Sequence, residues 1–176
     1  MESMLKQKNP SFFVKIYILV SIAQALRFLK LKSIVHMDLS LGNILMNQQL
    51  LLKLIDFGES YESQICKSST LLNTVDYNPG FTLPFAFPEL FRPGSAYTNK
   101  SDIFSFSIIV FQIIFSFFPY PNSFPLIYNL KKGTYFQKFY FAPEACSYVG
   151  YEKIVIMLLA LISKGMSPDE KKRPHP

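Results

Sequence analysis

Apolar residues near the start of the chain recur at helical spacing. Four of them share one face, with gaps of 4, 4 and 3 residues: Ile18, Ile22, Leu26 and Leu29. Such spacing places the four side chains in one apolar stripe along a helix. Pro10 followed by Ser11 is a start signal for a helix. Charged residues such as Lys15 and Arg27 interrupt the span. The pattern therefore predicts an amphipathic helix over about residues 13–31 and no membrane span.

Two short apolar runs follow this helix. Residues 44–46 and 51–55 have the length and composition of strands, and the polar residues 47–49 between them indicate a hairpin. The hairpin leads directly into Asp56-Phe57-Gly58. Residues 59–87 show no sustained period, and a connection of this length is uncommon unless it is functional or disordered.

The most apolar stretch of the chain is residues 103–118, between Asp102 and Pro119. Sixteen helical residues rise about 24 Å, which is short of the roughly 30 Å hydrocarbon core of a bilayer. We therefore expect a helix buried on all sides. A further helix is predicted at about 150–164, closed by Gly165.

Composition is that of one globular domain. The 176 residues are 49% hydrophobic and 17% charged, which is too apolar for a disordered chain. The net charge of +6 comes largely from short clusters such as Lys131-Lys132 and Lys171-Lys172-Arg173, so we expect a solvated surface and no nucleic-acid partner. Neither a signal peptide nor a disulfide framework is evident, which favours a cytoplasmic protein with no membrane contact.

The polar residues that carry chemistry occur in a fixed order. His36-Met37-Asp38 precedes Asn43 by five residues, counted from the aspartate, and Asp56 lies thirteen residues after Asn43. Each residue alone reads as an ordinary turn residue. Their order changes this interpretation, because a hairpin separates Asn43 from Asp56 and a long loop then leads to Phe87-Pro88-Glu89.

These motifs together resemble the C-terminal lobe of a eukaryotic protein kinase. The segment H-M-D-L-S-L-G-N, residues 36–43, is similar to the family's catalytic loop H-R-D-L-K-x-x-N, and Asp56-Phe57-Gly58 matches its D-F-G. Residues 87–89 resemble A-P-E, and residues 98–107 resemble the start of its central helix. The resemblance covers residues 1–176 and implies an α+β, mainly α fold: a helical lobe with a small β-hairpin carrying the D-F-G, and an activation segment at 56–89.

The resemblance also implies roles for individual residues. Asp38 would be the catalytic aspartate, Asn43 and Asp56 would bind Mg²⁺, and Leu45 would pack under the adenine of ATP. A second group would hold the site together without touching the reacting atoms: His36, Phe57, Gly58, Thr82, Glu89, Asp102 and Arg173. Thr82 also favours a serine/threonine-type or tyrosine-kinase-like protein over a true tyrosine kinase. The implied partner is a protein substrate.

Three departures from the family pattern reduce the expected activity. The 37 residues before Asp38 leave room for one helix only, so we expect the chain to begin at the family's αE helix and to lack the smaller lobe with its Gly-rich loop. Ser40 replaces a cation that contacts the transferring phosphate, and losing such a donor costs about 10²–10³ in rate. Met37 replaces an arginine that binds a loop phosphate, so order in the loop should not depend on phosphorylation.

Three functions therefore stay open at this stage. The chain is part of a protein kinase that transfers phosphate from ATP, it is a catalytically impaired pseudokinase-like module that binds proteins, or it is a non-functional remnant. We expect binding of ATP and Mg²⁺ to be weak and the isolated chain to be inactive, because half of the nucleotide site is missing.

Overall fold

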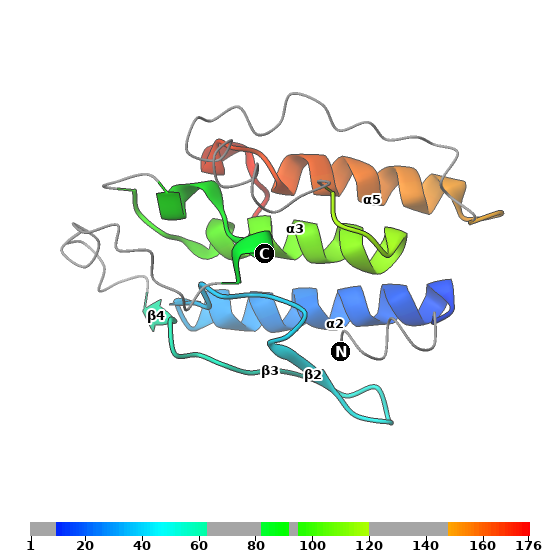
Figure 1. Ribbon diagram of the computed structural model, residues 1–176, viewed down its shortest axis with the longest axis horizontal. Helices are drawn as coiled ribbons and strands as arrows, with labels where there is room; N and C mark the ends of the chain where they lie inside the picture. Colours follow the sequence, from blue (N-terminus) through cyan, green and yellow to red (C-terminus); the bar gives the residue numbers. More distant parts are fainter. Residues whose placement is uncertain (1–9, 63–81, 92–94, 120–147) are drawn as a thin grey trace.

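Three helices dominate the secondary structure of the described residues, and α3 lies between the other two (Figure 1). The structure is a computed structural model that describes residues 10–62, 82–91, 95–119 and 148–176. Most of the predicted loop 59–87 lies outside these residues, as do both cysteines and the Lys131-Lys132 cluster. The helices are α2 (Phe12–Leu31), α3 (Asn99–Phe115) and α5 (Glu152–Gly165).

Helix α2 confirms the predicted position of the first helix. The Ser11 side chain caps it by accepting a hydrogen bond from the Val14 N–H at 3.5 Å. The four residues of the predicted apolar face are all buried. The amphipathic prediction was wrong, because the opposite face is also largely apolar. By length and composition α2 could cross a membrane, yet this test is also passed by core helices, and seven of its residues are buried in the protein.

Helix α3 is the buried helix expected from the long apolar run. It begins at Asn99, three residues before Asp102, because Thr98 and Ser101 form a reciprocal capping box there. It ends at Phe115, ahead of Pro119. The next residue, Ser116, has a left-handed backbone conformation with φ 64°. Ile108 and Ile114 are buried, as predicted.

Helix α5 confirms the last predicted helix but corrects the role given to Gly165. The glycine is the final helical residue and its φ is not positive, so it does not act as a left-handed cap. A Cβ at this position would lie 1.9 Å from the Ser107 hydroxyl oxygen. Gly165 is therefore required because α5 approaches α3 closely.

The strands form two small antiparallel sheets. The predicted hairpin is present, with β2 (Ile44–Met46) paired to β3 (Leu52–Leu54) and Ile44 opposite Leu54. The other sheet, β1 (Ile34–Val35) with β4 (Tyr61–Glu62), was not predicted, because two-residue strands leave no periodic signal. One 3-10 turn, η1 (Leu83–Phe85), lies within the predicted loop, and two more lie at η2 (Pro88–Phe91) and η4 (Glu170–Lys172).

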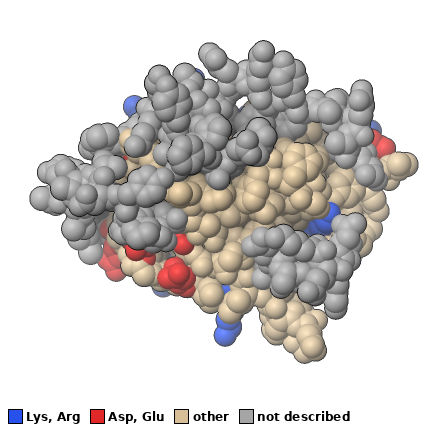
Figure 2. All heavy atoms as spheres, viewed as in Figure 1, with Lys and Arg blue, Asp and Glu red and all other residues tan. Residues whose placement is uncertain are grey.

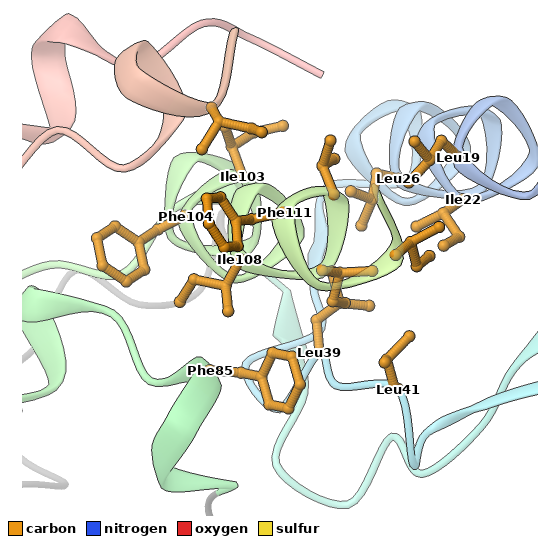
Figure 3. Packing of buried hydrophobic residues seen from close by; sticks show 14 of the residues in the cluster. Leu19, Ile22, Leu26, Leu39, Leu41, Phe85, Ile103, Phe104, Ile108 and Phe111 are labelled. Atoms are coloured by element: carbon orange, nitrogen blue, oxygen red, sulfur yellow. The ribbon is translucent and has the colours of Figure 1, made fainter. Parts of the chain in front are cut away.

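The core joins the helices to the segment that follows β1. Figure 3 shows side chains from α2 and α3 meeting Leu39, Leu41 and Phe85. The described part of the chain is thus mainly helical with a small antiparallel strand component, an α+β arrangement. The segment between β1 and β2 is fixed to the core by apolar side chains on both sides of Asp38.

Candidate functional site

Asp38 lies in the segment between β1 and β2, and both of its carboxylate oxygens accept hydrogen bonds. Oδ1 accepts from the Thr82 N–H at 2.8 Å. Oδ2 accepts from the Asn43 Nδ2 at 2.8 Å and from the Thr82 hydroxyl at 3.2 Å. The Asn43 Nδ2 also donates to the Asp38 carbonyl at 2.8 Å. A carboxylate held from two directions keeps one orientation, which suits a group that must receive a proton at a fixed point.

The hairpin brings Asp56 beside Asn43. The Ile55 N–H donates to the Asn43 carbonyl at 2.9 Å, so the residue before Asp56 continues the β2–β3 pairing. Asp56 itself takes a left-handed backbone conformation with φ 64° and is exposed. Such a conformation is uncommon outside glycine, and functional sites often retain it.

The oxygens at this position fit a magnesium ion shared with a phosphate ligand. The amide nitrogen of Asn43 is committed to Asp38, and the hydrogen bonds found in the described chain leave its Oδ1 free to coordinate. Asp56 adds a carboxylate. Among the described residues no three His, Cys, Asp or Glu side chains form a metal cage. Mg²⁺ commonly binds through one or two protein oxygens together with substrate phosphates, so this limited ligand set is suitable.

His36 connects the Asp38 segment to the residues after the hairpin. Its Nε2 lies 3.1 Å from the Ile55 carbonyl oxygen, and its ring centroid lies 4.7 Å from that of Phe57. Burial lowers the pKa of His36 below 6.5 despite the nearby carbonyl and the charge of Asp38. The neutral imidazole can therefore donate from Nε2 to the carbonyl and pack against an aromatic ring.

Asp102, in the first turn of α3, also holds the backbone of the segment that carries Asp38. Its carboxylate accepts hydrogen bonds from the backbone N–H of His36 at 2.8 Å and of Met37 at 3.0 Å. Burial raises the pKa of Asp102 to about 7, against the effect of these two donors. Met37 has φ 71°, a strained conformation for its side chain. The two hydrogen bonds help to hold this strained turn immediately before Asp38.

Asn99 is a positioning residue that the sequence did not point to. Its Nδ2 donates to the Ile34 carbonyl at 2.7 Å, so the first turn of α3 holds the segment at β1 as well as at His36. Asn99 and Asp102 are three residues apart and lie on one side of the helix. That spacing was the available signal that Asn99 acts together with Asp102. However, a polar residue near a helix start is usually explained by capping alone.

Glu89 and Arg173 form a buried ion pair. The Arg173 Nη2 lies 2.5 Å from Glu89 Oε1, and its Nη1 lies 3.1 Å from Oε2. The guanidinium also donates to the carbonyls of Lys100 and Ser167, at 3.1 and 2.8 Å. This bidentate pair joins η2 to the end of the chain and takes no part in the Asp38 cluster.

The remaining predicted residues differ in exposure. Ser40 and Met37 are buried, whereas Gly58 is exposed. Leu45 is 49% exposed and Phe57 is 42% exposed, so both apolar side chains are available at the surface. Figure 2 shows a face on which the described side chains are mostly uncharged and the acidic ones gather near β4. The loop hydroxyl residues Thr70 and Thr74 lie outside the described residues.

The family assignment rests on a match along nearly the whole chain. The protein kinase domain family matches residues 6–176. The chain belongs to this family. The family match agrees with the resemblance that the order of motifs indicated.

Individual protein kinases are similar over parts of the chain. An RGS domain-containing serine/threonine-protein kinase of Dictyostelium discoideum is 33% identical over 61% of this chain and 9% of its own length. A probable LIM domain-containing serine/threonine-protein kinase of the same organism is 33% identical over 66% of this chain and 17% of its own length. A tyrosine-protein kinase of Caenorhabditis elegans is 33% identical over 72% of this chain and 22% of its own length. The chain thus spans less than a quarter of these kinases.

Proposed function

We propose that this chain supplies the catalytic-loop half of a protein kinase that transfers phosphate from ATP to a protein hydroxyl, preferably serine or threonine. In this proposal residues 1–176 are the C-terminal lobe and residues 56–89 the activation segment. The observation that carries the proposal is the double anchoring of the Asp38 carboxylate by Asn43 and Thr82.

Asp38 is assigned the role of orienting the attacking hydroxyl and accepting its proton. A group with this role needs a fixed carboxylate oxygen near the acceptor, and the bonds from Thr82 and Asn43 restrict Asp38 to one rotamer. Thr82 lies within the loop that leads to Glu89, so it would also fix the surface where the acceptor peptide lies.

Asn43 and Asp56 are assigned to the metal ion that accompanies ATP. Mg²⁺ would neutralise charge on the phosphates when bound. The residues would contribute one amide oxygen and one carboxylate, and the Ile55–Asn43 hydrogen bond keeps the backbone before Asp56 next to Asn43. Leu45 would contact the adenine from its exposed position on β2.

Ser40 and Met37 favour a weakened enzyme, which is our second candidate: a pseudokinase-like module that acts by binding proteins. Ser40 is buried and carries no charge for the transferring phosphate. Met37 is buried and apolar, so it offers no donor to a phosphorylated loop. We therefore propose that transfer by this chain alone is weak or absent.

A phosphoryl-transfer assay tests the catalytic assignment. The full chain is incubated with radiolabelled ATP, Mg²⁺ and casein, beside the variants Asp38→Asn and Ser40→Lys. We expect Ser40→Lys to raise transfer by about 10²-fold, because it restores a cation beside the phosphate. Asp38→Asn in the Ser40→Lys background should remove this gain. Transfer that survives Asp38→Asn would contradict the role given to Asp38.

A further inference from the structure

Ser105 lies on α3, yet its hydroxyl is bonded outside that helix. The residue is buried, and its Oγ donates to the Phe85 carbonyl at 2.7 Å. A serine inside a helix often donates to the carbonyl four residues earlier. Ser107 does so, with its Oγ 2.8 Å from the Ile103 carbonyl oxygen. The Ser105 hydroxyl instead connects α3 to η1.

The backbone of Phe85 connects Ser105 to Thr82. The carbonyl of Phe85 accepts the Ser105 hydrogen bond, and the N–H of Phe85 donates to the Thr82 carbonyl at 2.9 Å. Thr82 in turn donates from its N–H and its hydroxyl to the two carboxylate oxygens of Asp38, at 2.8 and 3.2 Å. A series of hydrogen bonds thus leads from α3 through η1 to Asp38.

The same helix also holds the segment that carries Asp38. Ser105 follows Asp102 by three residues, so the two side chains are neighbours about one turn apart on α3. Asp102 accepts hydrogen bonds from two backbone N–H groups directly before Asp38. Because α3 holds one segment through Asp102 and the other through Ser105, the spacing of these two residues sets how Asp38 and Thr82 meet.

A simpler explanation of Ser105 is that its hydroxyl only satisfies a buried carbonyl. Apolar packing also holds η1, since the Phe85 side chain belongs to the core shown in Figure 3 and its ring centroid lies 5.5 Å from that of Phe118. However, apolar contacts are not directional, so they do not fix the rotation of a short turn. A hydrogen bond requires a narrow range of distance and angle, and the contacts between Thr82 and Asp38 need this precision.

We propose that Ser105 is a positioning residue of the site: its hydrogen bond to η1 orients Thr82 on the Asp38 carboxylate. This inference rests on the proposed function, in which Asp38 orients the attacking hydroxyl. Ser105 itself is too buried to touch a substrate. Without its hydroxyl, η1 would keep its apolar packing but would rotate, and the contacts between Thr82 and Asp38 would weaken. Small misplacements of this kind slow the chemical step.

Amide hydrogen exchange of the isotope-labelled full chain tests this arrangement. Ser105→Ala removes the hydroxyl. Ser107→Ala is the matched control, because Ser107 is a buried serine of the same helix whose hydroxyl is bonded within α3. We expect the Thr82 N–H to exchange about tenfold faster in Ser105→Ala than in Ser107→Ala. The N–H groups of His36 and Met37 should exchange at the same rate in both variants.

Transfer kinetics give a readout that a purely structural serine would leave unchanged. In the Ser40→Lys chain, with casein as the acceptor, adding Ser105→Ala should lower kcat about tenfold and leave the KM for ATP unchanged. Adding Ser105→Thr, which keeps a hydroxyl, should restore much of kcat. Adding Ser107→Ala should leave both constants as they are.

The proposal is overturned if the Thr82 N–H exchanges equally in Ser105→Ala and Ser107→Ala. It is also overturned if the N–H groups of Thr82, His36 and Met37 all exchange faster together in Ser105→Ala, because the serine would then support only the stability of the whole fold. Absence of transfer by the Ser40→Lys chain would contradict the proposed function instead, and the exchange rates would still decide the role of Ser105.

Discussion

Single side chains from the first turn of α3 hold the backbone that carries Asp38. Asp102 accepts hydrogen bonds from two consecutive N–H groups, and Asn99 donates to the carbonyl of Ile34 two residues earlier. These contacts fix a turn that contains the strained Met37. The geometry of the site thus depends on residues that need not touch a substrate.

Replacing Asp102 should change both the stability and its pH dependence. Asp102→Ala leaves two buried N–H groups unpaired, with an expected cost of about 2–5 kcal/mol in the free energy of unfolding. Because burial raises the Asp102 pKa from 3.8 to about 7, the folded state binds more protons than the unfolded state between these values. The stabilisation associated with its protonated form is therefore complete below pH 3.8 and is lost as the pH rises through about 7.

Urea unfolding across this pH range, with Asp102→Asn as the control, tests whether the contribution of Asp102 to the stability falls as the pH rises. The asparagine keeps the size of the side chain but does not titrate. The unfolding free energy of the native chain minus that of Asp102→Asn should decrease from pH 4 to pH 7. A difference that stays constant or increases would show that Asp102 does not have a raised pKa.

The Glu89–Arg173 pair should matter to folding and not to the chemistry at Asp38. Arg173→Ala leaves a buried carboxylate without its partner, and we expect a loss of about 3–5 kcal/mol in the free energy of unfolding. Replacing both residues by methionine should recover much of this loss, because no charge is then buried. Single variants within about 1 kcal/mol of the native chain in urea unfolding would contradict the assignment.

At the scale of elements, α3 is the central support, since α2, α5, β1 and η1 all contact it. Its most extensive contact is with α5, where Gly165 lies against Ser107. The resemblance of residues 98–107 to the family's central helix implies that Ser107 stands in place of a glycine. Here the extra volume of the serine on α3 is accommodated by the absence of a side chain on α5.

This contact predicts a pair of coupled substitutions. Gly165→Ala should destabilise the chain by about 1–3 kcal/mol, because its Cβ would overlap the Ser107 side chain. Adding Ser107→Gly should reduce that loss, although glycine within a helix itself costs about 1 kcal/mol. A double-mutant cycle from thermal or urea unfolding gives the coupling. Additive effects of the two substitutions would show that the helices do not meet at these residues.

Over the whole molecule, the elements with a long periodic signal were predicted from the sequence. The positions of α2, α3 and α5 and the β2–β3 hairpin follow from apolar spacing and stop signals. The β1–β4 sheet and the role of Asn99 were not predictable, because each depends on contacts between residues far apart in the chain. The exposed apolar side chains of α2 were missed for another reason: the amphipathic interpretation rested on the few charged residues in the span.

The candidate site was predicted from motif order more than from local pattern. Asp38, Asn43 and Asp56 are common loop residues, and only their order along the chain marked them. The expectation that Thr82 supports the site came from the resemblance and not from local pattern, because the hydrogen bond from Thr82 to Asp38 joins residues 44 positions apart. Such a contact forms only when η1 packs against α3.

Calorimetric titration of the full chain with Mg²⁺ and ATP tests the central claim, that Asn43 and Asp56 form a metal-dependent nucleotide site. Asp56→Asn removes the proposed carboxylate, and Glu59→Gln is the matched control, since Glu59 is also acidic and exposed three residues away. We predict weak binding that EDTA or Asp56→Asn abolishes and that Glu59→Gln preserves. Nucleotide binding that is unchanged by EDTA and by Asp56→Asn would contradict the account.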